Sequence, residues 1–246
     1  MSAQVRVGTS GWSYDHWAGV FYPEHLGAAH RLEYYSRQFS TVEIDATFYR
    51  LPSENAVKTW HDTVPEGFVF AVKGSRFITH YRRLRDVDEA LATYLDRLGA
   101  LGEKLAVVLW QLPPTFARDD VTLGAFLDLL ARSSPDGLRH AVEFRHGSWL
   151  DDVVFALLRE HGAAIVSVSS DELPECRVAT ADFVYVRFHG TAAYHGAYER
   201  PALEPWAAYL AEQSAAGRDV YAYFNNDAEG HAPSDARRLL GMLENG

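Results

Sequence analysis

The chain has 246 residues, of which 48% are hydrophobic and 23% are charged, so it can bury a sizeable core and is not a disordered protein. Its formal net charge of −10 disfavours a long nucleic-acid backbone as the main partner, although a local basic pocket for one small anion remains compatible with it. The single cysteine, Cys176, excludes an intrachain disulfide and a zinc site built on cysteines.

The sequence shows no sign of a membrane segment. Residues 1–6 lack the long apolar stretch of a signal peptide, and no apolar run approaches the roughly 18 residues that a spanning helix needs. We therefore expect a cytoplasmic protein with no membrane partner, in a compartment that keeps Cys176 reduced.

Strand-like runs and helical patterns alternate along the whole chain. The expected strands are Val5–Gly8, Thr41–Thr47, Phe68–Lys73, Leu105–Leu112, Leu138–Arg145, Ala163–Ser169, Phe183–His189 and Val220–Asn225. The expected helices are Ser53–Asp62, a helix capped by Asp86 and stopped by Gly99, Asp120–Arg132, Asp151–His161, Glu204–Ala216 and Pro233–Glu244. Eight units in 246 residues average about 31 residues each, the size of one strand and its following helix.

The sixth unit is irregular. Its segment Asp171–Thr180 contains Pro174 and fits a helix poorly. No linker, low-complexity stretch or sequence repeat divides the chain, so we expect one domain over residues 1–246.

The alternation of strands and helices fits both a barrel and an open doubly wound sheet. The distribution of apolar and polar residues on the two faces of each strand distinguishes these folds. Apolar and polar residues alternate in Val42–Thr47, Val142–Arg145, Val166–Ser169 and Val184–His189, whereas a sheet covered on both faces needs continuous apolar strands. An antiparallel sheet with one wet face would alternate similarly, but the intervening helices argue against it. We predict an α/β fold, a single (β/α)8 TIM-type barrel in which polar residues converge on the axis.

Outward positions in this barrel should be apolar, and the long segments should follow strands. We expect Val42, Phe144 and Phe188 to face helices. The loops after strands form the functional face of a barrel. Their aromatic residues can stack on a ligand or, equally, pack as a lid: Trp12, Tyr14, Trp17, Phe21, Tyr22, Tyr81, Tyr194 and Tyr198. Four of these are the expected ligand contacts, namely Trp12, Tyr14, Tyr194 and Tyr198.

The last inward residues of the strands form a mixed polar set at one end of the barrel. They are Glu43, Asp45, Lys73, Gln111, Glu143, Arg145, Ser169, Arg187, His189 and Asn225, with His80 in the loop after Lys73. The three cations and three carboxylates nearly cancel. A buried ion-pair lattice without function is the alternative, but such a lattice is costly to desolvate, which favours a ligand or chemistry here.

Roles follow from the chemistry of these side chains. Arg145 and Arg187 carry planar forks suited to a carboxylate or phosphate. Lys73 among other cations is a candidate base or Schiff-base nucleophile with a lowered pKa. The expected catalytic residues are Glu43, Lys73, Glu143 and His189, with the glutamates as general acid and base and a histidine, His189 or His80, as proton shuttle. The expected ligand contacts also include His80, Gln111, Arg145, Arg187 and Asn225.

Other site types have weaker support. Glu43, Asp45, Glu143, His80 and His189 can in principle hold a divalent metal, but they lack a fixed ligand spacing, so we assign no metal ligand and leave any cofactor open. There is no P-loop. Gly8-Thr9-Ser10-Gly11 is not a nucleophile elbow, because Trp12 stands where that motif needs its last glycine.

A series of short motifs runs in order along nearly the whole chain. They are Gly8–Trp12, Phe21–Pro23, Val42–Ile44, Thr47–Pro52, Phe70–Lys73, Thr79–His80, Gln111–Pro114, Val142–His146, Tyr185–Arg187, His189–Gly190 and Tyr223–Asn226. In these motifs the chain resembles the YecE-like family of bacterial and archaeal proteins, a domain family of unknown function. The resemblance implies a TIM-barrel-like fold and supplies no established reaction. Asp45 departs from the family pattern, in which Asn is usual.

Three functional hypotheses remain open. The leading one is an enzyme that acts on a small, polar, anionic metabolite such as a sugar or nucleotide phosphate through an isomerase- or lyase-like acid–base step. The second is a metal-dependent, nuclease-like hydrolase, and the third is a protein that binds a small ligand without catalysis. Because TIM barrels host many unrelated reactions, the fold alone does not choose among them.

Overall fold

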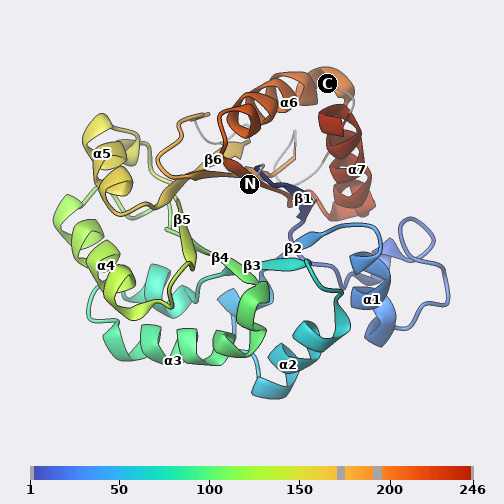
Figure 1. Cartoon of the computed structure of the whole chain (residues 1–246), viewed down its shortest axis with the longest axis horizontal. Helices are drawn as coiled ribbons and strands as arrows, with labels where there is room; N and C mark the ends of the chain where they lie inside the picture. The colour runs from blue at the N-terminus through green and yellow to red at the C-terminus, as the bar shows by residue number, and fades with distance from the viewer. Residues whose placement is uncertain (1–2, 171–174, 191–195, 245–246) are drawn as a thin grey trace.

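The computed structural model describes residues 3–170, 175–190 and 196–244. Its eight strands are all parallel and form one sheet in the order β1-β8-β7-β6-β5-β4-β3-β2. They are β1 (Val5–Thr9), β2 (Thr41–Ile44), β3 (Val69–Lys73), β4 (Leu105–Gln111), β5 (Arg139–Glu143), β6 (Ala164–Ser169), β7 (Phe183–Phe188) and β8 (Asp219–Phe224). Figure 1 shows them as a ring within the helices.

The ring is closed between its two end strands by a short contact. A parallel bridge joins Ser10 to Glu43, and the backbone amide of Gly11 donates to the Glu43 carbonyl at 2.8 Å. The sheet is therefore a nearly closed barrel. This confirms the predicted TIM-type fold over the open doubly wound sheet.

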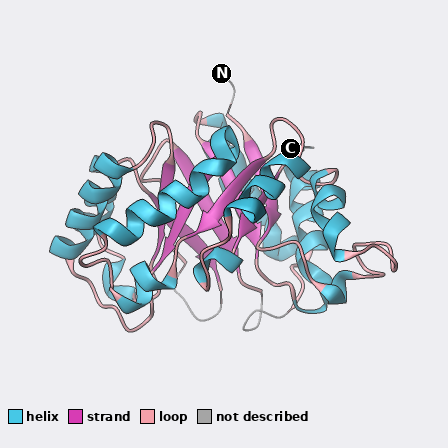
Figure 2. Cartoon of the chain, turned by 90° about the horizontal axis from the view of Figure 1, so that it is seen from below, coloured by secondary structure: helices cyan, strands magenta, loops and turns pink. Residues whose placement is uncertain are grey.

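Seven α-helices surround the strands in the part of the chain that the structure describes (Figure 2). They are α1 (Arg31–Ser36), α2 (Glu54–Thr63), α3 (Asp88–Leu98), α4 (Asp120–Ser133), α5 (Asp152–Glu160), α6 (Arg200–Ala215) and α7 (His231–Glu244). The side chains of Ser53, Asp119 and Asp151 cap α2, α4 and α5 by accepting hydrogen bonds from backbone amides of the first turn. No described residue between β6 and β7 is helical, as the irregular sixth unit predicted.

Several predicted boundaries were wrong. Helix α1 was not predicted, and α6 starts at Arg200 instead of Glu204 because Pro201 fits the first turn of a helix. Asp86 does not cap α3; the preceding residue of that helix is Val87, while Asp86 has a positive φ of 49° in the turn before it.

Two separate apolar cores follow from the alternation of the strands. The outer core lies between strands and helices and includes Val42, Phe144 and Phe188, on the side where they were predicted. The inner core fills the barrel with residues of β3 to β8 and their flanks: Ala71, Val107, Leu109, Ala141, Ala164, Val166, Val168, Phe183, Tyr185, Tyr221 and Tyr223. These side chains pack against one another inside the barrel, so this part of the lumen is filled.

Strand β6 reverses the predicted orientation. Its valines, Val166 and Val168, belong to the inner core, so the alternating Ser169 points outward, where its hydroxyl accepts a hydrogen bond from Tyr198 at 3.0 Å. The expectation that Ser169 faces the axis was wrong, because a single step along a strand changes the face of the sheet.

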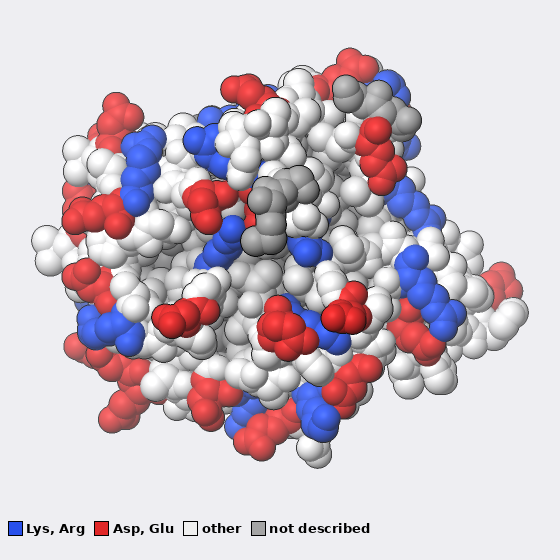
Figure 3. Space-filling view, in the orientation of Figure 1, with Lys and Arg blue, Asp and Glu red and all other residues white. Residues whose placement is uncertain are grey.

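The surface carries charges of both signs. Acidic and basic side chains are interspersed on the face shown in Figure 3, without a continuous basic area among the described residues. None of the described helices combines the length and apolarity that a bilayer crossing requires.

Candidate functional site

A cavity of about 430 Å³ opens where the strands end. The residues that line it come from the ends of β3, β4, β7 and β8 and from the segments after β2 and β3: Asp45, Phe48, Tyr49, Lys73, Arg76, His80, Tyr81, Gln111, Arg187 and Asn225. Its size suits a small molecule, and it lies on the face of a barrel that ordinarily carries function.

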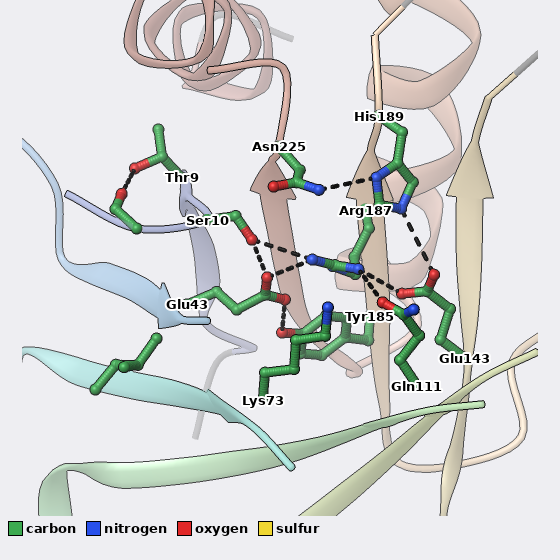
Figure 4. Close-up of polar contacts among 12 residues, drawn as sticks. Thr9, Ser10, Glu43, Lys73, Gln111, Glu143, Tyr185, Arg187, His189 and Asn225 are labelled. Carbon is green, nitrogen blue, oxygen red and sulfur yellow. Dashed lines mark hydrogen bonds and ion pairs between the residues drawn. The ribbon is translucent and has the colours of Figure 1, made fainter. Parts of the chain in front are cut away.

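Arg187 lies at the centre of the polar network beside this cavity (Figure 4). Its side chain is only 1% exposed, and it donates to Glu43 Oε1 and to Glu143 Oε2 at 2.7 Å each. The same two nitrogens also reach Ser10 Oγ at 3.1 Å and Gln111 Oε1 at 3.3 Å. A guanidinium has five N–H donors, and only Nε of Arg187 lacks a hydrogen-bond partner.

Glu43 and Glu143 are fully buried carboxylates. Burial raises the pKa of Glu43, but Arg187 and hydrogen bonds from Ser10 and Tyr185 outweigh it, so the pKa is lowered overall. The Tyr185 hydroxyl donates to Glu43 Oε2 at 2.6 Å. Burial likewise raises the pKa of Glu143, and Arg145 with Arg187 brings it well below its usual range. Both groups therefore remain ionised at neutral pH and are poorly suited as general acids.

Arg145, His189 and Asn225 extend the network from Glu143. Arg145 Nε donates to Glu143 Oε1, and Arg145 Nη2 lies 2.9 Å from His189 Nε2. The other ring nitrogen of His189 lies 3.1 Å from Asn225 Nδ2. Burial lowers the pKa of His189 to about 4, so its imidazole is neutral at pH 7.

Lys73, the last residue of β3, has a different environment. Its Nζ lies 4.4 Å from the centre of the Phe48 ring, and within the described part of the chain the ammonium has no hydrogen bond or ion pair. Burial lowers its pKa to about 8, with Arg187 as the next cause. Lys73 is therefore a cation in a cavity that can lose its proton near neutral pH.

Asp45 and His80 are the other titratable groups on this wall. Burial raises the pKa of Asp45, and the neighbouring Glu43 charge raises it further. Burial lowers the pKa of His80, and Lys73 adds to this effect. His80 Nδ1 lies 2.9 Å from the hydroxyl of Thr79, and its ring meets the edge of Phe48. The pKa of Asp45 is thus raised and the pKa of Lys73 is lowered, so both move toward neutral pH.

The predicted polar residues converge, but on two levels. Lys73, His80, Gln111, Arg187 and Asn225 line the cavity. A second group lies behind them and contacts Arg187 directly or through a neighbour: Glu43, Glu143, Arg145 and His189. The predicted convergence of polar strand residues on the barrel axis describes both groups. The glutamates, however, are bound by arginines and do not line the cavity.

Of the four aromatic residues expected to contact a ligand, two have packing roles. Trp12 meets Trp60 of α2 edge to face at 5.8 Å, and Tyr198 is only 2% exposed, with its ring against Phe188 and Phe224. Neither lines the cavity, because both rings bury their apolar faces against other rings. Their contact with a ligand therefore stays a prediction that this cavity does not support.

The other two expected ligand contacts, Tyr14 and Tyr194, differ from these. Tyr14 donates to the Ser10 carbonyl at 2.8 Å, and its ring lies so close to Gly11, at φ 80°, that a Cβ there would be 2.4 Å from its hydroxyl. Tyr14 therefore supports the backbone beside Glu43. Tyr194 lies outside the described residues.

Three cavity residues, Phe48, Tyr49 and Arg76, were absent from the predicted polar set and aromatic rim, whereas Tyr81, a member of that rim, lines the cavity as well. Phe48 lies on a short 3-10 turn after β2, while Tyr81 ends a π-helical turn, Phe77–Tyr81, after β3. The Arg76 guanidinium stacks over the Tyr49 and Tyr81 rings, at 5.5 and 5.6 Å from their centres. Phe48 and Tyr49 belong to Thr47–Pro52, one of the motifs shared with the YecE-like family, and this motif could have identified them as site candidates.

The candidate metal ligands do not form a preformed metal site in the described part of the chain. Among the residues that the structure describes, no group of three or more His, Cys, Asp or Glu side chains is arranged to hold an ion. Glu43 and Glu143, two of the candidate ligands, instead accept hydrogen bonds from Arg187. The arrangement present is one of carboxylates neutralised by arginines.

Comparisons with known proteins agree with the fold and with the motifs. A family model described as "Protein of unknown function DUF72" matches residues 6–246. UPF0759 protein YunF of Bacillus subtilis (strain 168) is 26% identical over 98% of this chain and 95% of its own length. UPF0759 protein YecE of Escherichia coli (strain K12) is 32% identical over 58% of this chain and 48% of its own length.

A solved structure is similar over the whole barrel. The crystal structure of a DUF72 family protein from Thermotoga maritima matches with a TM-score of 0.88 and 32% identity, covering 98% of this chain and 99% of that one. These matches confirm the resemblance to the YecE-like family. The chain belongs to the DUF72 family of proteins of unknown function.

Proposed function

We propose that this protein is an enzyme that binds a small anionic metabolite in the cavity and acts on it by acid–base chemistry, in an isomerase- or lyase-like step. The observation that carries this proposal is the Lys73 ammonium, which faces the cavity without a hydrogen bond in the described part of the chain. A lysine with a pKa of about 8 can take up and release a proton near neutral pH.

The charges around the cavity favour an anionic ligand. Within a chain of net charge −10, the cavity wall holds three cations, Lys73, Arg76 and Arg187, against one carboxylate, Asp45. Even when Glu43, Glu143 and Arg145 are included, cations outnumber carboxylates. Such a local excess raises the concentration of small anions at the mouth.

Arg76 is better placed than Arg187 to bind the anion. Arg187 directs its Nη1 and Nη2 donors to Glu43 and Glu143, so it positions the glutamates and contributes charge. In the described part of the chain, Arg76 stacks on Tyr49 and Tyr81 and has no hydrogen bond or ion pair. Its fork remains available for a phosphate or carboxylate.

Asp45 is the proposed partner of Lys73 in proton transfer. Its raised pKa brings it nearer to the range in which a carboxyl can donate as well as accept a proton. This role replaces the one expected for Glu43 and Glu143, whose pKa values are lowered by arginines. His80 borders the same cavity and is the proposed second proton carrier.

The test is binding, followed by turnover. Inorganic phosphate and glycerol 3-phosphate should raise the melting temperature of the wild type, and Arg76→Met should weaken this binding about tenfold or more, the effect of losing one charged hydrogen bond. Arg132→Met is the control, because Arg132 pairs with Asp88 on the surface, at 3.3 Å. Equal stabilisation of Arg76→Met and wild type would contradict the anion site.

Turnover separates the enzyme from a binding protein. A pool of phosphorylated metabolites incubated with wild type should lose one component and gain another, and Lys73→Met should abolish this change. A ligand that binds tightly and is recovered unchanged would instead support the non-catalytic hypothesis.

A further inference from the structure

The chain contains three lysines, Lys58, Lys73 and Lys104, and two of them are fully engaged. Lys58 Nζ pairs with Asp62 Oδ2 at 2.7 Å on the surface of α2. Lys104 Nζ donates to the backbone carbonyls of His61 and Val64 at 2.7 and 2.8 Å. Among the described contacts, the Lys73 ammonium has only the face of Phe48. Of the three lysines, Lys73 is thus the one whose nitrogen has no hydrogen bond or ion pair to an oxygen among the described residues.

The backbone that carries Lys73 is held rigidly. Its carbonyl accepts hydrogen bonds from the hydroxyls of Thr47 and Tyr94, at 2.7 and 2.8 Å. The next residue, Gly74, donates to the Leu109 carbonyl at 2.8 Å and packs so closely that a Cβ would be 2.4 Å from the Trp110 ring. Because the backbone at Lys73 is fixed, the Cα of this residue has little freedom to move relative to the cavity.

We propose that Lys73 is a nucleophile that forms an imine with the carbonyl carbon of an anionic aldehyde or ketone bound in the cavity. The inference rests on the proposed function and names its substrate class. The free amine needs a site with few hydrogen bonds and neighbouring cations, and Lys73 has both.

The steps balance with the groups at hand. Asp45 as carboxylate removes a proton from the ammonium, and the lone pair of Nζ forms a bond to the carbonyl carbon while the C=O π electrons move to oxygen. The oxygen takes the proton back from Asp45, giving a carbinolamine. A second proton, moved from nitrogen by the same carboxyl, lets the hydroxyl leave as water, and the nitrogen lone pair forms the C=N bond. Because the nitrogen keeps its last proton, the product is the protonated imine (the iminium ion), and Asp45 is a carboxylate again.

The surroundings support these steps. A pKa of about 8 leaves roughly a tenth of the amine unprotonated at pH 7, against less than about one part in a thousand for an ordinary lysine. The Phe48 ring covers one side of the nitrogen and limits the access of water that would hydrolyse the imine. Arg76, on the same wall, can hold the anionic end of the substrate.

The experiment traps the imine. The full chain is incubated at pH 7 with glyceraldehyde 3-phosphate or, separately, pyruvate, then reduced with borohydride, and the adduct is located by peptide mass spectrometry. We expect one adduct at Lys73 with at least one probe, in roughly tenfold or greater excess over Lys58, because the free amine is more abundant there. Lys58 and Lys104 are controls within the same molecule, so no variant has to fold.

Two further measurements keep the outcomes apart. Inorganic phosphate should suppress the Lys73 adduct, and Arg76→Met should reduce it, whereas neither should change labelling of Lys58. If phosphate raises the melting temperature but no probe gives an adduct enriched at Lys73, the imine is refuted and the anion site stands. If phosphate neither stabilises the protein nor protects Lys73, the proposed function fails as well.

Discussion

The ammonium of Lys73 lies 4.4 Å from the centre of the Phe48 ring, although the two residues belong to different strand units of the barrel. Lys73 ends β3, and Phe48 lies on the turn after β2. The pair places a cation, with no oxygen partner among the described residues, in the wall of a cavity that also holds Asp45 and Arg76. The expected consequences concern the cavity and the network behind it.

Arg187 should be essential for folding because it neutralises two buried carboxylates. Arg187→Met leaves Glu43 and Glu143 fully buried without this partner, which should cost about 3–5 kcal/mol. Urea unfolding monitored by circular dichroism measures the loss. The control is Arg132→Met, whose exposed pair with Asp88 should contribute less than about 1 kcal/mol. A tolerated or stabilising Arg187→Met would show that the glutamates are not ionised in the fold.

His189 should make stability depend on pH between its folded and unfolded pKa values. The folded pKa is about 4, below the ordinary value of 6.5, so the unfolded chain binds the extra proton first. The stability that depends on neutral His189 is complete above pH 6.5 and is lost as the pH falls toward about 4. His189→Gln should therefore reduce the slope of unfolding free energy against pH in this window. An unchanged slope would place the folded pKa near its ordinary value.

Asp45 should destabilise the fold at neutral pH. Its pKa is raised in the folded state by burial and by Glu43, so stability falls as pH rises from the unfolded pKa through the folded one. Asp45→Asn should therefore raise the melting temperature at pH 7 and lose this advantage in acid. The same variant should remove turnover, since an amide carries no transferable proton. Scanning calorimetry at pH 7 and pH 3.5 tests the first part, and a lower melting temperature at pH 7 would contradict it.

The architecture was largely predictable from alternation along strands. The pattern around Val42, Glu43 and Ile44 assigns one face to the helices and the other to the lumen, and closure of the barrel then brings Glu43 to Arg187, far away in sequence. The C-terminal strand ends share one face in a parallel barrel, so the polar set had to meet there.

Details of the site were harder to predict for a physical reason. Phe48 and Arg76, which were not predicted, lie on or beside short 3-10 and π-helical turns, whose side-chain directions have no simple period. The sequence also does not show which inward residues reach the cavity and which lie behind its wall. Glu43 and Lys73 are both inward residues, yet of these two only Lys73 lines the cavity. On β6, both faces are buried, so the alternation of Val168 and Ser169 did not identify the lumen side.

Direct titration of Lys73 tests the central claim, that this lysine is a proton-active group in an anion-binding cavity. Reductive ¹³C-methylation of the three lysines allows each amine to be followed by NMR as a function of pH, with Lys73→Met and Lys58→Met assigning the signals. We expect the Lys73 pKa near 8, and inorganic phosphate should raise it because the bound anion favours the ammonium. Lys58, exposed and paired with Asp62, should not respond to phosphate. A Lys73 signal that titrates near the ordinary value of 10.5 and ignores phosphate would contradict the account.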